Sequence, residues 1–200
     1  MKTEKYVHDK FEKLYNIFTG TSFLKSEGLA GEVPFYISHF EPEFQNEVDT
    51  AICNIKKKLF SSGVQVLDIN LYELCIELLK VEDDLEFIIE KEKSFENKKD
   101  LLSEIQNYLD IHEVVVPKIK KMIAKEAHDI VFLTGVGLVY PYMRSHNILN
   151  NLQKISKKPT VMFFPGKYVH HGSTGSSLNL FGKLLDDRYY RAKDLDLYDV

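Results

Sequence analysis

The chain has 200 residues, of which 44% are hydrophobic and 28% charged, and its formal net charge is −4. This length suits a single domain, residues 1–200, because chains of this size bury most of the surface that their unfolded forms expose. The composition is typical of a globular protein and excludes wholesale disorder. The negative charge argues against general affinity for nucleic-acid backbones, which depends on clustered Lys and Arg, but it leaves room for a local basic patch.

Hydropathy and cysteine usage indicate a cytosolic protein. Residues 1–18 are charged and amphipathic, and no apolar run approaches the roughly 20 residues that a membrane-spanning helix needs. Cys53 and Cys75 stand alone in apolar helical patterns, without CxxC spacing or nearby His ligands. We expect both to be buried, reduced thiols rather than parts of a disulfide or a metal site.

The first part of the chain predicts two helices with a strand between them. Apolar residues at helical spacing from Val7 to Phe18 predict a helix that ends near Gly20. Residues 33–37 are typical of a short strand. Pro42 can occupy the first turn of the next helix, which Ser61-Ser62-Gly63 should end. The apolar face of this helix would consist of Phe44, Val48, Ile52, Ile55 and Leu59.

The middle of the chain predicts a strand, a capped helix and a helical insertion. The strand covers residues 64–69, and Asn70 can cap the following helix, whose apolar stripe runs from Leu71 to Leu79. Residues 81–126 are charge-rich with helical apolar spacing and indicate an insertion. Residues 114–116 fit a helix or a strand, and Pro117 should kink or divide this part.

The last part predicts two further strands and their connections. Strands are expected at 130–133 and 160–164, with a helix around 148–155 between them. A final helix around 178–185 and an edge strand around 189–192 would complete the fold. Alternating strands and helices predict an α/β fold, with a mainly parallel, Rossmann-like sheet of about four to five strands flanked by helices.

The segment after the strand at 130–133 is the most informative in the chain. Gly135 and Gly137 follow a fully apolar strand and allow the backbone to approach a neighbour closely. Polar residues come next, including Arg144 and His146. In an open α/β sheet the carboxyl edge of the strands is where ligands and partners dock, so these residues occupy the expected position of a site.

Three ordered motifs carry a family resemblance. They are TGVGLVYPYMRSHNILNNL at 134–152, FFPG at 163–166 and LFGKLLDDRYYRA at 180–192, and the match extends to FLKSEGLAGEVPFYI at 23–37. Together they resemble the BrxB family, a small component of bacterial BREX phage-defence systems. The resemblance implies membership of a multiprotein system that includes a large ATPase, a phosphatase-like protein called PglZ and a DNA methyltransferase. It implies no established catalytic activity, no catalytic residues and no cofactor.

Gly135 and Gly137 allow two interpretations. A phosphate-binding loop would expose backbone N–H groups at a helix N-terminus. However, no Lys follows within reach as in a Walker A loop, and Tyr140 stands where a dinucleotide fingerprint needs a third glycine. A tight turn leaving a buried strand is the favoured interpretation.

Arg144 and His146 are compatible with catalysis, but a structural or interface role is favoured. Together they could bind an anion or move a proton, yet no partner nucleophile is evident. Alternatively, Arg144 pairs with Asp186 or Asp187, and His146 makes local hydrogen bonds. The pair Asp186-Asp187 could hold Mg²⁺, but a solvated or cap-forming pair is favoured because adjacent residues at a helix end diverge.

Residues 166–177 suggest a mobile polar loop. His170 and His171 can bind a stray metal, but they do not supply the ligand set of a zinc site, so no metal site is expected. Lys167 and Tyr168 precede them, and Tyr, like Arg, is a residue type enriched at interface hot spots. We therefore count Lys167 and Tyr168 among the interface or ligand candidates.

Three functional hypotheses follow. The first is a non-enzymatic adaptor of a phage-defence complex that contacts the PglZ-like protein and, second, the ATPase, with Arg144, His146 and Tyr168 serving assembly. The second is a nucleotide- or nucleic-acid-processing enzyme in which Arg144, His146, Lys167 and Asp187 converge on one pocket. The third is a DNA-contacting module that uses Lys-rich helices.

Overall fold

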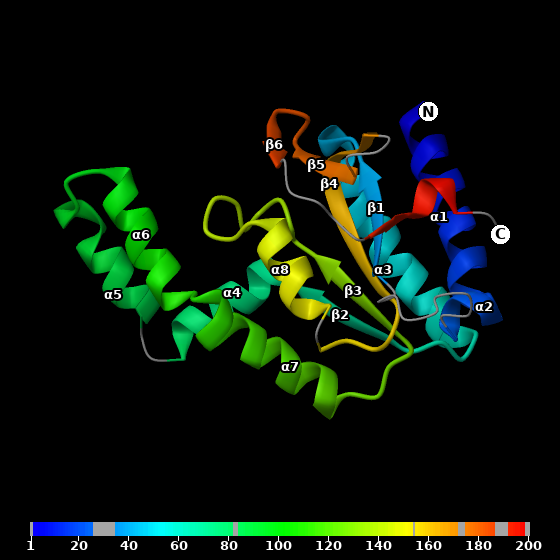
Figure 1. Ribbon diagram of the computed structural model, residues 1–200, viewed down its shortest axis with the longest axis horizontal. Coiled ribbons are helices and arrows are strands. Elements are labelled where there is room, and N and C mark those ends of the chain that lie inside the picture. The colour runs from blue at the N-terminus through cyan, green and yellow to red at the C-terminus, as the bar shows by residue number, and fades with distance from the viewer. Residues whose placement is uncertain are drawn as a thin grey trace.

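The structure is a computed structural model that describes residues 2–25, 35–81, 84–153, 155–171, 175–186 and 192–198. A twisted sheet forms its centre, and helices cover both faces of the sheet (Figure 1). Two helices of the insertion, α5 and α6, lie well to one side of the strands.

The five strands of the main sheet are parallel and lie in the order β2-β3-β4-β1-β7. Their bounds are β1 Phe35–Phe40, β2 Val66–Asn70, β3 Ile130–Thr134, β4 Thr160–His171 and β7 Lys193–Asp194. The distal half of β4 pairs with β5, Gly175–Leu180, which pairs with β6, Leu184–Asp186, and both pairings are antiparallel. The predicted α/β class with a mainly parallel sheet is therefore confirmed.

Helices α1, Lys2–Thr19, and α3, Gln45–Ser61, cover one face of the sheet together with the short α2, Thr21–Leu24. A 3-10 turn, η1, Pro42–Phe44, leads into α3, and Gly63, with φ 81°, follows the end of α3. Phe132 and Phe163 point to this side, and α1 packs over them. Their rings meet edge to face, with 5.0 Å between the ring centroids. This layer confirms the first two predicted helices.

The opposite face is covered by α4, Leu71–Lys80, α7, Val116–Lys125, and α8, Ser145–Leu152 (Figure 1). The side chain of Asn70 accepts hydrogen bonds from the backbone N–H groups of Tyr72 and Glu73, so the predicted cap of α4 is confirmed. Leu133 and Phe164 are fully buried beneath these helices.

The predicted insertion is helical. It contains α5, Asp84–Lys91, the 3-10 turn η2, Glu92–Ser94, and α6, Lys98–Tyr108, followed by the π-helix η3, Ile111–Val115, and then by α7. The ambiguity at residues 114–116 is resolved as helix, and Pro117 lies in the first turn of α7, where a missing N–H costs nothing. No helix among the described segments has the length and apolar character needed to cross a membrane.

Two predictions about the C-terminal part were wrong. Residues 178–185 form the end of β5, a turn and the start of β6 instead of a helix, and most of the expected loop at 166–177 belongs to the β4–β5 hairpin. Phe181 and Gly182 have φ angles of 54° and 66°, and two consecutive left-handed residues cannot belong to an α-helix. The expected edge strand at 189–192 lies almost wholly outside the described residues; β7 begins just after it.

Both cysteines were predicted to be buried, reduced thiols. This prediction is confirmed for Cys75, but the predicted burial of Cys53 is wrong. Both cysteines are free, but Cys53 is exposed on α3 whereas Cys75 is buried under α4. The face of α3 at Cys53 turns away from the sheet, because Ile52 and Ile55 provide the buried contacts.

Candidate functional site

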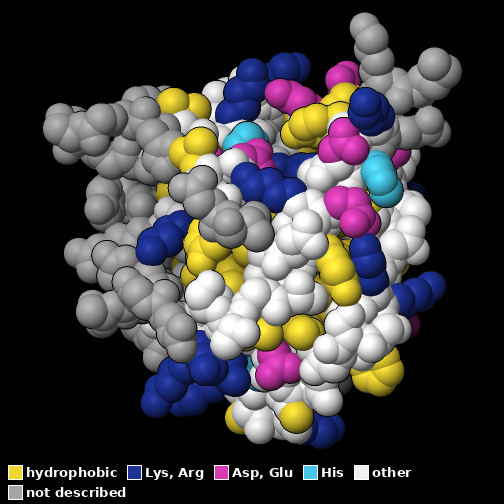
Figure 2. Space-filling model, turned by 90° about the vertical axis from the view of Figure 1, so that its right-hand side faces the viewer, with side chains coloured by type: hydrophobic (Ala, Val, Ile, Leu, Met, Phe, Trp, Pro, Cys, Tyr) yellow, Lys and Arg dark blue, Asp and Glu magenta, His cyan; other side chains and the backbone are white. Residues whose placement is uncertain are grey.

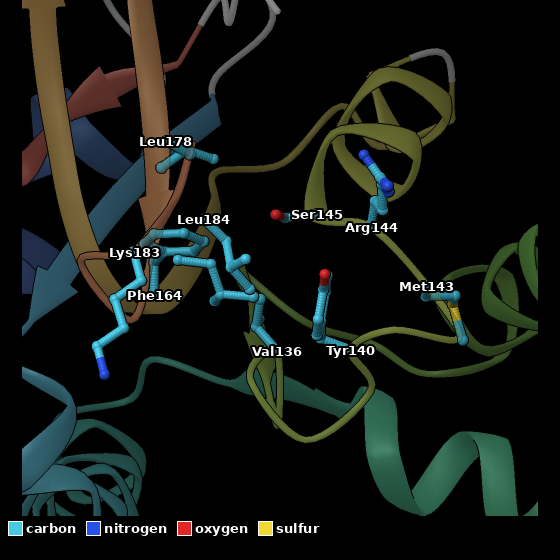
Figure 3. Close-up of a pocket in the computed structure, with 10 residues that line it drawn as sticks. Val136, Tyr140, Met143, Arg144, Ser145, Phe164, Leu178, Lys183 and Leu184 are labelled. Carbon is cyan, nitrogen blue, oxygen red and sulfur yellow. The ribbon is translucent and has the colours of Figure 1, made fainter. Parts of the chain in front are cut away.

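A pocket of about 240 Å³ lies where the turn after β3, the start of α8 and the β5–β6 hairpin meet (Figure 3). The segment joining β3 to α8 forms one wall, and the hairpin forms the other. Both lie near the carboxyl edge of the parallel sheet, which is the expected place for a site in this fold class. The pocket is lined by Val136, Tyr140, Met143, Arg144, Ser145, Phe164, Leu178, Leu180, Lys183 and Leu184.

The two glycines of the turn are explained by close packing. Gly135 has φ 68° and lies directly against the side chain of Asn70, so that an added Cβ would collide with Oδ1 of the α4 cap. A Cβ on Gly137 would stand 2.8 Å from Cγ of Pro165 and 3.1 Å from Cε1 of Phe181. The glycines therefore let the turn approach the α4 cap on one side and the hairpin on the other.

The pocket is lined by apolar side chains, two hydroxyl-bearing residues and two cationic residues. Val136, Phe164 and Leu178 belong to the apolar core, whereas Arg144 is exposed at the residue before α8 and makes no side-chain cap. In Figure 3 the hydroxyl groups of Tyr140 and Ser145 point toward the space between the turn and the hairpin, and the ammonium group of Lys183 points away from it.

The structure separates the residues that the sequence grouped together. Arg144 lines the pocket, whereas His146, in the first turn of α8, is only 3% exposed. Tyr168 is also buried, and its hydroxyl donates a hydrogen bond of 2.8 Å to the carbonyl oxygen of Ala192. Lys167 is exposed, with its ammonium 4.0 Å from Oε1 of Glu41. Asp187 lies outside the described residues.

Sequence reasoning missed the contributions of Lys183, Leu184 and Tyr140 to the pocket. Lys183 and Leu184 lie in a stretch that was expected to be helical, and only the hairpin brings them to the turn. The alternation of polar Ser177 and Asn179 with apolar Leu178 and Leu180 is a period-two signal that is compatible with a strand but too short to exclude a helix.

The pocket offers guanidinium, ammonium and hydroxyl groups together with apolar side chains. Among its described lining residues there is no carboxylate, imidazole or thiol that could serve as a general base, a nucleophile or a metal ligand. Arginine, tyrosine and apolar side chains around a small recess are instead the composition of an interface hot spot.

A second polar cluster lies on the other face of the sheet, beside α3. The hydroxyl of Thr134 donates a 2.9 Å hydrogen bond to Oδ1 of Asp68, and the ammonium of Lys56 pairs with Oδ2. These groups border an open depression of about 580 Å³ near the exposed Cys53 and Phe60. Because each oxygen of Asp68 has a close donor, the cluster is explained as an internal tie between α3, β2 and β3.

Comparison with known proteins gives consistent matches along the chain. The family described as BREX protein BrxB matches residues 67–195. BREX protein BrxB of Bacillus cereus (strain H3081.97) is 34% identical over 194 residues, which cover 94% of this chain and 97% of that protein. BREX protein BrxB of Escherichia coli O9:H4 (strain HS) is 25% identical over 173 residues, covering 85% and 82%. No solved structure matches the chain. The chain belongs to the BrxB family and is a component of a BREX phage-defence system.

Proposed function

We propose that this protein is a non-enzymatic adaptor of its BREX system and that it contacts the phosphatase-like PglZ partner through the carboxyl edge of the sheet. The large ATPase is the second candidate partner. The observation that carries the proposal is the composition of the pocket, which combines Arg144 with apolar side chains and has no carboxylate, imidazole or thiol among its described lining residues.

The surface around the pocket supports the same role. Leu138, at 56% exposure, and Tyr142, at 37%, project from the turn, and Phe181 and Leu184 are exposed to a similar degree on the hairpin. We call these four residues, with Arg144 and Lys183, the turn–hairpin surface. Apolar and aromatic side chains combined with Arg characterise the residues that dominate binding energy at protein interfaces.

The buried candidates would act from inside this surface. Tyr168 ties the β4–β5 hairpin to the segment before β7, and His146 packs within the first turn of α8. Both residues are buried close to the segments that line the pocket. In this proposal Arg144 makes the contact, and His146 and Tyr168 maintain the shape that presents it.

The described residues do not bring together the groups that the enzymatic alternative needs. Of the three described residues that it requires, only Arg144 lines the pocket, since His146 is buried and Lys167 lies beside Glu41. A catalytic set must first meet in space around one substrate position.

The test is co-purification of the complete chain with the PglZ-like protein of the same system. Arg144→Ala should weaken the affinity by about 30-fold or more, the effect of losing a central hot-spot contact. Lys125→Ala, which removes an exposed cation from α7, is the matched control and should bind normally. Both variants should melt as the unsubstituted protein does, because both side chains are exposed.

Two results would contradict the proposal. If Arg144→Ala stays folded and binds both the PglZ-like protein and the ATPase normally while phage resistance is lost, Arg144 has a ligand-binding or catalytic role. If Arg144→Ala instead unfolds, its role is structural, and Leu138→Asp then tests whether the turn–hairpin surface binds the partner. Normal binding by folded Leu138→Asp would exclude this surface.

A further inference from the structure

A histidine and two aspartates meet at the opposite edge of the sheet, far from the turn after β3 in the strand order. His39 is near the end of β1, Asp194 is in β7 beside it, and Asp196 is in the 3-10 turn η5, Leu195–Leu197. Nε2 of His39 is 3.2 Å from Oδ2 of Asp196 and 3.6 Å from Oδ2 of Asp194. On the face that carries α1 and the C-terminal segment, His side chains lie among acidic and basic ones (Figure 2).

The two carboxylates are held in fixed orientations. Oδ1 of Asp194 accepts a 2.9 Å hydrogen bond from the backbone N–H of Asp196, and Oδ1 of Asp196 pairs with the ammonium of Lys10 from α1. Lys13 also donates a 2.8 Å hydrogen bond to the backbone carbonyl of Asp196. In both aspartates one oxygen is thus engaged by a donor on the far side, and the other oxygen faces the imidazole.

The imidazole alone does not explain this arrangement. Nε2 carries at most one hydrogen, so it can donate a well-aligned hydrogen bond to only one carboxylate. Yet both Oδ2 atoms are directed at it, and the Asp194 side chain is only 6% exposed. A metal ion placed between Nε2 and the two Oδ2 atoms would be bound by all three groups at once.

The distances fit a small metal ion. All three ligand atoms lie within 4.8 Å of one another. In a tetrahedral zinc site, with bonds of about 2.0–2.2 Å, neighbouring ligand atoms are about 3.3–3.6 Å apart. The two distances from His39 nearly match this range, and all three ligand atoms must be drawn to this spacing to bind one ion. Two carboxylate oxygens and one imidazole nitrogen would leave a fourth position for water.

We propose that His39, Asp194 and Asp196 form a binding site for a divalent transition-metal ion, with Zn²⁺ as the best match. An imidazole ligand favours Zn²⁺ over Mg²⁺ and Ca²⁺, which prefer all-oxygen sites. Because the ligands come from β1 and from the C-terminal segment, the ion fastens residues 193–197 to the sheet beside α1. The site is separate from the turn–hairpin surface and goes beyond the proposed adaptor function.

The experiment uses the complete chain, treated with a chelator that is then removed, and titrated with ZnCl2 by calorimetry. One equivalent of Zn²⁺ should bind and raise the melting temperature, because a ligand that prefers the folded state stabilises it by mass action. Mg²⁺ at the same concentration should give neither effect. His39→Gln should weaken Zn²⁺ binding by at least about 10-fold, since loss of a ligand costs no less than loss of its supporting hydrogen bond.

Two further variants make the result specific. Asp196→Asn, at a position where the side chain is 32% exposed, should lose affinity like His39→Gln while keeping a cooperative melt. The double variant His170→Gln/His171→Gln is the matched control, because adjacent histidines can bind stray zinc on their own. It should bind one equivalent as before. The proposal is overturned if the unsubstituted chain binds no Zn²⁺, if both site variants bind it normally, or if the double variant abolishes binding.

Discussion

Gly135 at the end of β3 packs directly against Oδ1 of Asn70, the atom that caps α4. This oxygen accepts hydrogen bonds of 3.0 and 3.2 Å from the N–H groups of Tyr72 and Glu73. One contact therefore links the turn that forms the candidate site to the start of α4 on the neighbouring strand. The absence of a side chain at position 135 is a packing requirement and not evidence of a phosphate site.

Gly135→Ala should lower the free energy of unfolding by roughly 2 kcal/mol or more. The left-handed backbone, with φ 68°, costs about 1 kcal/mol for a residue with a Cβ, and disturbing the α4 cap costs about another. Gly63→Ala is the matched control, because Gly63 also has positive φ but nothing lies within 4 Å of an added Cβ. Urea unfolding should show the smaller loss for Gly63→Ala; equal losses would mean that the contact with Asn70 contributes nothing.

Tyr168→Phe should destabilise the protein by about 1 kcal/mol. It removes the hydroxyl that donates to the carbonyl oxygen of Ala192 and leaves that acceptor without this donor. Tyr142→Phe, at an exposed position, should be close to neutral. Thermal or urea unfolding of both variants checks this, and a neutral Tyr168→Phe would show that solvent replaces the lost bond.

The main sheet could be predicted because its signals are local and redundant. The run from Ile130 to Leu133 is apolar throughout, as expected for a strand buried on both faces, and all four residues are fully buried. The cap at Asn70 and the stop at Gly63 were equally readable, since each depends on the preferences of one residue type.

The C-terminal hairpin could not be read in the same way. Leu178, Phe181 and Leu185 satisfy helical spacing, while Leu178 and Leu180 satisfy strand spacing, and so short a segment leaves periodicity ambiguous. The segment becomes a strand because it pairs with the distal half of β4, and this pairing is a tertiary interaction that local periodicity does not reveal. Lys183 was missed as a site residue for this reason, and His39 was missed because its two aspartate neighbours are more than 150 residues away in sequence.

The two cysteines should react very differently with a thiol reagent. Burial raises the pKa of the Cys75 thiol to about 12, so at about pH 8 this thiol stays neutral and inaccessible, whereas Cys53 is exposed. Titration with an aromatic disulfide reagent should detect one thiol in the folded protein and two in denaturant. Cys53→Ser should show none until it unfolds. Rapid reaction of Cys75 in folded Cys53→Ser would contradict the burial.

The same pKa predicts a loss of stability in alkali. The unfolded chain ionises this thiol near its ordinary pKa of 9.0, while the folded chain keeps it neutral to about 12. The neutral Cys75 thiol therefore makes its full contribution to the free energy of unfolding below pH 9.0, and this contribution declines as the pH rises toward 12. Cys75→Val, of similar volume and without a thiol, should lose less stability between these values in urea unfolding. An identical pH profile for the two proteins would contradict this assignment.

Leu133→Asp should prevent folding. Leu133 is fully buried in β3, and an unpaired carboxylate there is strongly unfavourable. Leu138→Asp is the matched control five residues later, where the side chain is 56% exposed, and it should yield a folded protein. Soluble expression and a cooperative melt measure both. A folded Leu133→Asp variant would require the central strand to be reassigned.

The isolated protein should neither bind nor hydrolyse ATP appreciably. The turn after β3 lacks the Lys that reaches the β and γ phosphates in a Walker A loop, and its glycines are occupied by packing against Asn70 and Pro165. The pocket beside it has a volume of about 240 Å³, and Val136 and Phe164 are among its lining residues. Calorimetry with Mg-ATP and a phosphate-release assay should both give baselines, unchanged in Arg144→Ala. Saturable binding at micromolar ATP that Arg144→Ala abolishes would instead establish a nucleotide site at the carboxyl edge, and the adaptor proposal would then have to give way to the enzymatic alternative.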